Sequence, residues 1–174
     1  MNNRLTRIVT KSGDGGNTGL ADGKRVAKDA KIIHAIGDID ELNSSIGMVR
    51  SHCKNKDLDR ELQQLQRQLF NLGGDLCLPG SVLLNAEQLS TIEESLAHHN
   101  KKLAPLKDFI LPAGSELTVR LHMARSICRR AERSLVAAAK CNEFNPLCLP
   151  FINRLSDYLF VLARSSNELA EMLW

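Results

Sequence analysis

Leucines recur at helical spacing through a long stretch in the second quarter of the chain. They stand at positions 58, 62, 65, 69 and 72, and these steps of three or four residues bring them to one face of an α-helix. Pro79-Gly80 breaks the pattern. Only 4% of the residues are aromatic although 43% are apolar, so leucine, isoleucine and alanine have to fill the core. The pattern predicts a helix over 57–76 and favours helices packed on helices over a β-sandwich.

Four other segments carry the same period, which brings the expected number of helices to five. Asp29 is a candidate cap for the first helix, and its apolar stripe consists of Ile32, Ile33, Ile36, Ile39, Leu42, Ile46 and Val49. The third helix is expected to start at Asn85 or Ala86 and to end near Leu103.

The last two helices follow a connection over 104–114, which contains two prolines and an apolar centre at 109–111. Ser115 can cap the fourth helix, which we expect to run to about Lys140. Pro146 and Pro150 stand where a first helical turn tolerates proline, and the fifth helix is expected to reach the C-terminus.

The chain is expected to form a single domain over 1–174, because it has 174 residues and no internal repeat. Residues 1–28 lack the helical period and are expected to be mostly loop, followed by a helix bundle over 29–174. The predicted fold is all-α, a five-helix up-and-down bundle with a glycine-rich N-terminal loop.

The segment TKSGDGGNTG, from Thr10 to Gly19, combines four glycines with hydroxyl side chains and a lysine. Glycine accepts positive φ and lets backbone N–H groups surround an anion, so the segment is a candidate phosphate cradle; a flexible, solvated arm is the alternative. It is not a Walker A loop, because the only Gly-Lys pair has Thr18 five residues before its glycine and Arg25 after its lysine. It is not a Rossmann fingerprint, because Thr18 stands where the third glycine is needed.

Charge and cysteine usage exclude several classes of protein. The net charge of +3 is too small to indicate nucleic acid or a membrane surface as a partner, and the apolar runs are too short to span a membrane. The first residues lack the apolar region of a signal peptide, and the glycine segment leaves no room for a transit peptide, so a cytoplasmic protein is expected. The five cysteines form no C-x-x-C pair, so we expect inert thiols and no metal site.

The fourth predicted helix carries RSICRRAER over 125–133. Arg125, Arg129 and Arg133 follow one another at four-residue steps, so one helical stripe presents three guanidinium groups. Arginine binds phosphate oxygens in a bidentate geometry, which makes the stripe a candidate phosphate site; an ordinary solvated face with one ion pair is the alternative.

Carboxylates are dense on two of the other predicted helices. Asp38, Asp40 and Glu41 lie within two turns of the first helix, and Asn153 and Asp157 are one turn apart on the fifth. Carboxylates inside otherwise apolar helices usually need cationic partners, and the arginine stripe is their expected source.

These motifs occur together in one known family. TKSGDGG followed by Lys28-Asp29, then DELNSSIG, FILPAG, RSICRRAER and INRLSDYLFVLAR, resemble in this order the PduO-type ATP:cob(I)alamin adenosyltransferases, from Thr10 to about Arg164. The resemblance implies a homotrimer of five-helix bundles with active sites between subunits. It also implies a reaction in which the Co(I) of cob(I)alamin attacks the 5′ carbon of ATP, bound with Mg²⁺, and expels triphosphate to give adenosylcobalamin. Side chains would then act by positioning and charge stabilisation.

The resemblance also implies roles for individual residues. Asp40 and Arg125 match a pair that forms an intersubunit salt bridge and shapes the catalytic site. Phe109 matches an aromatic that packs on the lower face of the corrin and keeps the axial base off cobalt, and Asp157 is assigned to the corrinoid as well. The residues assigned to ATP are Thr10, Lys11, Ser12, Gly13, Thr18, Gly19, Lys28, Arg129, Arg130, Glu132, Arg133 and Asn153.

One departure from the family pattern matters most, and one alternative function stays open. Gly15 stands where members often carry lysine, so a cation near the phosphates is missing unless Lys24 or Arg25 replaces it. The alternative is a non-catalytic chaperone or sensor that binds corrinoid and ATP on the same bundle. A ferritin-like di-iron bundle is disfavoured, because no glutamate has a histidine three residues on, and the five histidines are expected to be exposed or satisfied. Possible protein partners are a cobalamin reductase and an adenosylcobalamin-dependent enzyme.

Overall fold

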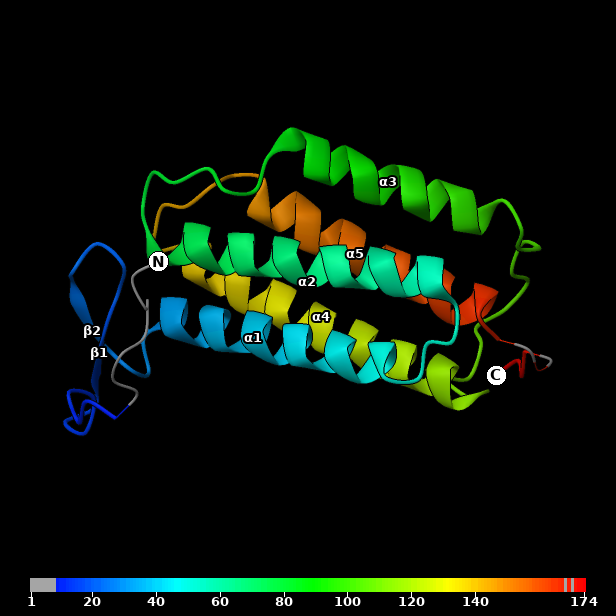
Figure 1. Ribbon diagram of the computed structural model, residues 1–174, viewed down its shortest axis with the longest axis horizontal. Coiled ribbons are helices and arrows are strands. Elements are labelled where there is room, and N and C mark those ends of the chain that lie inside the picture. The colour runs from blue at the N-terminus through cyan, green and yellow to red at the C-terminus, as the bar shows by residue number, and fades with distance from the viewer. Residues whose placement is uncertain (1–8, 168, 170) are drawn as a thin grey trace.

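The computed structural model describes residues 9–167, 169 and 171–174, which form five α-helices and a small antiparallel hairpin. The elements are β1 (Asn17–Gly19), β2 (Arg25–Ala27), α1 (Lys31–Arg50), α2 (Lys56–Cys77), α3 (Ala86–Asn100), α4 (Glu116–Ala139) and α5 (Cys148–Ser165). The helices run alternately in opposite directions along the long axis of the molecule (Figure 1). The predicted all-α, five-helix up-and-down bundle is therefore confirmed.

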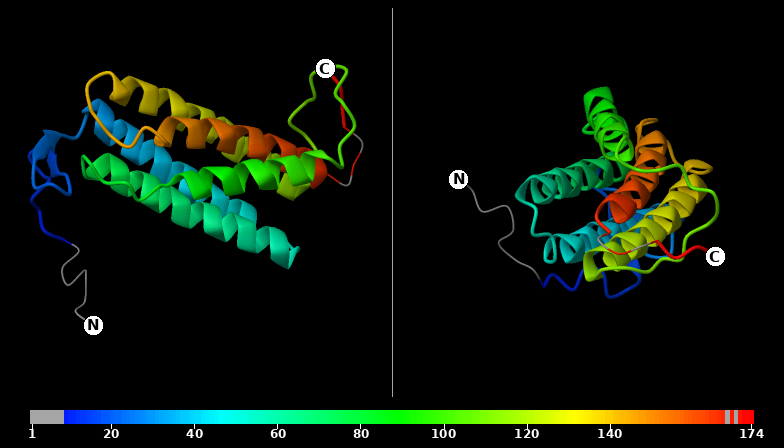
Figure 2. Two further views of the ribbon diagram at one scale, coloured as in Figure 1. Left: turned by 90° about the horizontal axis from the view of Figure 1, so that it is seen from above. Right: turned by 90° about the vertical axis from the view of Figure 1, so that its right-hand side faces the viewer.

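Four helices enclose the core and the fifth covers one side of it. α1 packs against α2 and α4, and α5 packs against α4, whereas α3 packs on α5 at the edge of the bundle (Figures 1 and 2). The leucines whose spacing predicted α2 are buried, and so are the apolar faces of α1, α4 and α5. Burial of these faces is the main force that holds the helices together, because it removes the aliphatic side chains on one face of each helix from water.

Two helix starts agree with the cap residues expected from the sequence. The side chain of Ser115 accepts the N–H of Thr118, and Asn85 forms a reciprocal capping box with Gln88. Asp29 as the cap of α1 is wrong, since α1 begins after Ala30 and no side chain caps it. The physical reason is the turn that leaves the hairpin, in which Ala30 N–H donates to the carbonyl of Ala27 at 3.0 Å and Asp29 points to solvent.

Two helices end earlier than expected. α3 ends at Asn100, not near Leu103, and α5 ends at Ser165 instead of reaching the C-terminus. Beyond α5 the side chains compete with helical bonding, because Ser165 donates to the carbonyl of Leu162 and Asn167 accepts the N–H of Leu169. The chain then turns back along the connection that contains Phe109.

The N-terminal segment is more structured than expected. Within the described part of 1–28, β1 and β2 pair with Thr18 opposite Val26, and the turn between them uses Gly23 at φ +85°. The N–H of Ala21 donates to the carbonyl of Cys77 at 3.1 Å, which attaches the hairpin to the end of α2. Residues 1–8 lie outside the described residues. The hairpin sits at the end of the bundle where α1 begins, opposite the end that carries the C-terminus (Figures 1 and 2).

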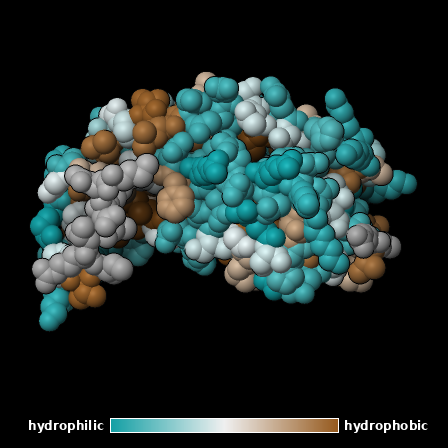
Figure 3. All heavy atoms as spheres, viewed as in Figure 1, coloured by the Kyte–Doolittle hydropathy of each residue, from teal (hydrophilic) through white to brown (hydrophobic). Residues whose placement is uncertain are grey.

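The surface seen in Figure 3 is mainly hydrophilic, with hydrophobic side chains gathered toward the ends of the bundle. No helix among the described residues is long and apolar enough to cross a membrane. All five cysteines are free thiols, of which Cys128 and Cys148 are buried, and burial raises the pKa of Cys148 to about 12. Those two thiols are therefore inert at neutral pH, as expected.

Candidate active site

The glycine-rich segment forms two consecutive tight turns. The N–H of Asp14 donates to the carbonyl of Lys11 at 3.3 Å, and the N–H of Gly16 donates to the carbonyl of Gly13 at 3.2 Å. Lys11 adopts φ +58° and Gly16 φ +80°, so the backbone turns through left-handed conformations that expose its amides. The hydroxyls of Thr10 and Ser12 lie 2.8 Å apart. This arrangement places hydroxyl, amide and ammonium donors on one exposed loop.

Two cations lie against this loop. The Nζ of Lys28 is 3.0 Å from the point where a Cβ on Gly13 would stand, so a side chain at position 13 would displace the lysine. Arg25 Nη2 donates to the carbonyls of Ser12 at 2.7 Å and Asn17 at 3.0 Å. Arg25 therefore brings a guanidinium to the loop that lacks a lysine at position 15. Lys24 instead pairs with Asp22 at 3.3 Å, within the hairpin turn.

The arginines of α4 fall into two groups. Arg130 faces α1, where it pairs with Glu41 and lies 3.5 Å from Asp38, and the hydroxyl of Ser134 also donates to Asp38. Among the described residues, neither Arg129 nor Arg133 forms an ion pair or a hydrogen bond, and both are exposed. The expected cationic partner of the α1 carboxylates is thus Arg130, not a member of the four-residue stripe.

Glu132 and Asn153 connect α4 to α5. Asn153 Nδ2 donates to Glu132 Oε1 at 3.0 Å. Asp157 stands one turn farther along α5 and is exposed, with Arg154 donating to its carboxylate at 3.2 Å. The α4–α5 surface therefore carries the two exposed arginines beside polar groups that are already oriented by hydrogen bonds.

Arg125 is the most buried of the predicted cations. Its Cζ lies 5.8 Å from the centre of the Phe160 ring, a cation–π contact, and its Nε is buried without a hydrogen-bond partner among the described residues. Burial, and next the charge of Arg129, lower the pKa of the Arg125 guanidinium, which nevertheless remains charged at neutral pH. A desolvated cation with an unused donor is suited to a negatively charged partner.

Phe109 and Arg125 line the same hollow. Residues 106–110 of the connection, with Arg125 and Phe160, enclose about 530 Å³. A smaller apolar hollow continues beyond Phe109, between Ile110, Leu111 and Trp174. Phe109 is 78% exposed, so its ring does not pack in the core. Phe160 and Trp174 were not predicted as site residues, because Phe160 lies in an apolar helix and Trp174 approaches only through the fold of the chain.

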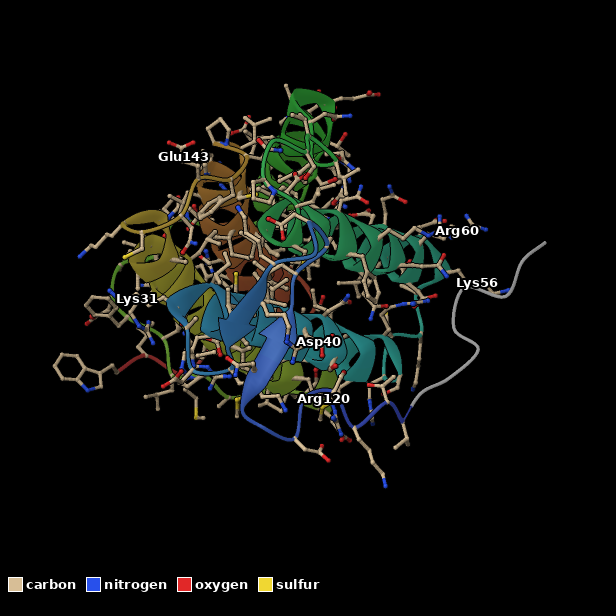
Figure 4. All side chains as sticks on the ribbon, turned by 90° about the vertical axis from the view of Figure 1, so that its left-hand side faces the viewer. Lys31, Asp40, Lys56, Arg60, Arg120 and Glu143 are labelled. Carbon is tan, nitrogen blue, oxygen red and sulfur yellow. The ribbon has the colours of Figure 1, made fainter. Side chains whose placement is uncertain are left out.

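Asp40 does not meet Arg125 within one chain. Its carboxylate is exposed on α1 and forms no ion pair with any described residue. Figure 4, seen from the hairpin end, shows Asp40 on the same side of the bundle as Arg120 of α4, away from α3. The glycine-rich loop and the connection that carries Phe109 are also separate, since they lie at opposite ends of the bundle (Figure 2).

His122 contradicts the expectation that the histidines are exposed or satisfied. It is 5% exposed, and its Nδ1 is buried without a hydrogen-bond partner among the described residues. Its ring lies 6.3 Å from that of Phe160, so it stands behind the wall of the hollow at Phe109. Its position in an amphipathic helix beside Leu121 gave little indication of this, because the boundary of the apolar face falls there.

Comparison with known proteins identifies the family. The sequence model of the cobalamin adenosyltransferase family matches residues 8–166. The chain belongs to this family. It is 46% identical, over 178 aligned residues, to the cobalamin adenosyltransferase of Cupriavidus metallidurans, covering 100% of this chain and 97% of that protein.

Solved structures of cobalamin adenosyltransferases match the fold. One is a variant of the PduO-type ATP:corrinoid adenosyltransferase of Lactobacillus reuteri complexed with cobalamin and ATP, with a TM-score of 0.91, 36% identity, and coverage of 97% of this chain and 99% of that chain. Another variant from the same organism, complexed with ATP, has a TM-score of 0.90, 39% identity, and coverage of 96% and 99%. The resemblance to the PduO-type enzymes that the motifs indicated is confirmed.

Proposed function

We propose that this protein transfers the 5′-deoxyadenosyl group of ATP to the cobalt of cob(I)alamin, forming adenosylcobalamin and releasing triphosphate. The observation that carries the proposal is the hollow shared by Phe109 and Arg125, in a family member whose fold matches a structure complexed with cobalamin and ATP. The ring offers an apolar surface that suits a corrin, and the desolvated guanidinium beside it needs an anionic partner.

The nucleotide side of the reaction needs cations more than covalent chemistry. In the transfer, the electron pair of Co(I) forms the cobalt–carbon bond, and the electrons of the broken C5′–O bond leave with triphosphate. Charge builds up on the leaving group, so preorganised cations lower the barrier. Arg129 and Arg133 are exposed and make no ion pair with any described residue, so their guanidiniums can bind phosphate oxygens, and Lys11 and Lys28 add charge at the glycine-rich loop.

The remaining residues of the ATP set have supporting roles. Thr10, Ser12, Gly13, Thr18 and Gly19 form or flank the loop whose amides and hydroxyls can cradle phosphate. Arg130 is already shared by Asp38 and Glu41, so we propose that it mainly holds α1 against α4. The bond from Asn153 to Glu132 fixes both side chains for contact with the nucleotide.

Mg²⁺ is proposed to enter with ATP. This ion is usually held by substrate phosphates and one or two carboxylates, and it supplies further positive charge to the leaving triphosphate. Within the described residues no three His, Cys, Asp or Glu side chains cluster as a ligand set. The exposed carboxylate of Asp14, inside the loop turns, offers one oxygen ligand of the right kind.

On the corrin side, Phe109 is proposed to occupy the lower face of the cobalt. An aromatic ring there displaces the axial base, and four-coordinate cobalt is reduced more readily to Co(I). The exposed ring of Phe109, with Phe160 and Trp174 nearby, forms an apolar wall that favours displacement of the axial base. Asp157 is proposed as a polar contact to the edge of the corrinoid.

A homotrimer with intersubunit sites is the proposed assembly. The loop precedes the start of α1, whereas the ion pair His52–Glu116 brings the start of α4, and the connection before it, to the other end of that helix, roughly 30 Å away. One chain therefore cannot bring the loop and Phe109 together on one substrate pair. The ion pairs His52–Glu116 and Arg130–Glu41 show that α1 and α4 run antiparallel. Met48 and Met123 lie seven residues from Glu41 and Arg130 along the same seam, and both are exposed. This apolar surface beside Asp40 is suited to contact a second copy of the chain. The Arg125 of that copy would form an ion pair with the Asp40 carboxylate.

The cellular setting follows from the proposed reaction. Free thiols at all five cysteines are suited to the reducing cytoplasm. Because Co(I) must be supplied and adenosylcobalamin consumed, a cobalamin reductase and an adenosylcobalamin-dependent enzyme are the proposed protein partners.

Calorimetry and turnover of matched variants test the proposed site. Arg129→Ala and Lys11→Ala should each weaken ATP binding by about 1.5–3 kcal/mol, because each removes a charge-assisted contact. Arg60→Ala is the control, because Arg60 pairs with Asp57 on the exposed side of α2. Unchanged ATP affinity in both site variants, or an equal loss in the control, would contradict the proposed nucleotide site.

A further inference from the structure

Few side chains of the connection that carries Phe109 are buried. Phe109 is 78% exposed, and Leu106 and Leu111 are exposed as well. The only strand pairing that 101–114 make with the described residues is the bridge at Ile110. An aromatic ring that does not pack into the core is not positioned by its own burial. Its position has to come from contacts of the backbone around it.

The end of the chain supplies these contacts. Residues 171–174 run antiparallel to 109–111, with Ile110 opposite Leu173. The N–H of Leu111 donates to the carbonyl of Met172 at 2.9 Å, and the N–H of Trp174 donates to the carbonyl of Phe109 at 2.9 Å. These bonds fix the backbone of Phe109 and of the second residue after it. The side chains of Met172, Leu173 and Trp174 are themselves exposed, so this tail needs an anchor elsewhere.

Arg164, in the last turn of α5, is that anchor. Its side chain is only 7% exposed. Its Nε and Nη2 donate to the two carboxylate oxygens of Glu171 at 2.7 and 3.3 Å, and Nη2 also donates to the carbonyl of Ala104 at 2.9 Å. One guanidinium therefore joins three segments: the end of α5, the start of the connection and the tail. A two-point arginine–carboxylate pair fixes direction as well as distance.

The far end of the connection is held by the same region. Gly114 adopts φ +134°, and a Cβ there would stand 2.6 Å from Oδ1 of Asn167, two residues after α5. The connection thus contacts the end of α5 at Ala104 and Gly114 and the tail between them. Arg164 is the one charged group among the described residues that bonds to both the connection and the tail.

We infer that Arg164, through its pair with Glu171, is a positioning residue that holds Phe109 in place at the cobalt. The role of Phe109 at the cobalt rests on the proposed function. Arg164 acts only through backbone and does not touch substrate: it fixes the tail, the tail fixes the backbone at 109–111, and that backbone directs the ring. Loss of the pair should leave the nucleotide site intact and free the connection to move.

The first test needs no ligand. Hydrogen exchange of the Leu111 and Trp174 amides should be about tenfold faster in Arg164→Gln and Glu171→Gln, because opening then no longer breaks a charge-assisted pair. Arg50→Gln is the matched control, since Arg50 makes the same two-point contact with Asp59 at 2.7 and 3.2 Å between α1 and α2. Arg164→Lys, which keeps the charge without the fork, should restore protection only in part. Unchanged exchange in Glu171→Gln, or equal acceleration in Arg50→Gln, would overturn the inference; if Arg164→Gln does not fold, Glu171→Gln decides.

The second test measures the coordination of the cobalt in bound cob(II)alamin. With ATP and cob(II)alamin bound, electron paramagnetic resonance should show the four-coordinate fraction of Glu171→Gln reduced about fivefold or more, while the KM for ATP stays within about twofold and kcat falls. Faster exchange with an unchanged four-coordinate fraction would overturn the positioning role. Absence of the four-coordinate signal in the unmodified protein would contradict the proposed function and with it the role at cobalt, and the exchange rates would still decide whether Arg164 holds the connection.

Discussion

At the scale of single residues, the ring of Phe109 is exposed, so its effect on function can be distinguished from an effect on core packing. Phe109→Ala should change the free energy of unfolding by less than about 1 kcal/mol, because the ring is 78% exposed. Cob(II)alamin bound with ATP should then stay five-coordinate, and turnover should collapse while ATP affinity is retained. Urea denaturation and paramagnetic resonance measure the two effects.

Phe151 provides the matched control for this prediction. It is fully buried in α5, so Phe151→Ala should lower the free energy of unfolding by about 3–5 kcal/mol. A loss of that size in Phe109→Ala, with the four-coordinate signal retained, would contradict the corrin-facing role.

His122 makes a separate prediction about pH. Burial, and next the charge of Arg125, lower its pKa below the ordinary 6.5, although Glu171 acts in the opposite direction. The unfolded chain therefore binds more protons than the folded one as the pH falls through 6.5, and the free energy of unfolding must decrease. The contribution of the neutral His122 ring to the free energy of unfolding is therefore fully present above pH 6.5 and is lost on acidification.

Replacement of the ring tests this sign. His122→Gln should flatten the fall in stability between about pH 7 and 5, whereas His98→Gln, at an exposed position, should keep it. Denaturation curves at several pH values measure the slope. A slope in His122→Gln as steep as that of the unmodified protein would show that other groups cause it.

At the scale of elements, Asp75 connects three of them. The carboxylate is fully buried and accepts bonds from the hydroxyl of Ser81, the N–H groups of Leu83 and Leu84, and the amide of Asn145, at 2.7–3.0 Å. Burial alone would raise the pKa of Asp75, but these bonds outweigh it and lower the pKa. The end of α2, the α2–α3 connection and the α4–α5 connection therefore depend on one side chain.

Asp75→Asn should lower the free energy of unfolding by about 2–4 kcal/mol, because an NH₂ group would face donors that need an acceptor. Asp57→Asn, in the exposed first turn of the same helix, should cost less than about 1 kcal/mol. Urea denaturation compares the two. Equally small losses of the free energy of unfolding in both variants would mean that the two connections do not depend on Asp75.

The helices could be predicted from the sequence, whereas the segments that join them could not. Leucine spacing is a local signal, and it located α2 within one residue at each end. β1 and β2 are three residues each and carry no alternation of apolar and polar side chains, so nothing marked them. The tail escaped prediction for another reason: its partner at 109–111 lies some sixty residues earlier in the chain, and neither segment has a pattern that specifies the other.

At the scale of the whole molecule, the proposed site depends on a second copy of the chain. The family resemblance implied a pair between Asp40 and Arg125 of different subunits. Within the single chain the pair does not form, since Asp40 is exposed on α1 while Arg125 lies against Phe160 of α5. The periodicity of one sequence describes one bundle, so the faces that meet in an assembly cannot be derived from it.

Asp40→Asn should loosen the assembly and sharply reduce turnover, because an unpaired guanidinium left in a largely desolvated contact costs about 3–5 kcal/mol. Glu143→Gln, an exposed carboxylate in the α4–α5 connection, is the control and should leave both unchanged. Sedimentation measures the assembly. A stable monomer for the unmodified protein would contradict the intersubunit site.

The most direct test of the central claim is to count both products of one reaction. Purified protein is incubated without oxygen with ATP, Mg²⁺ and chemically reduced cobalamin, and adenosylcobalamin is followed by its absorption spectrum while the phosphorus products are separated. The account predicts many turnovers, with one intact triphosphate released for each adenosylcobalamin formed. Tight binding of ATP and cobalamin without either product would contradict it and would identify the protein as a non-catalytic chaperone or sensor of the same fold.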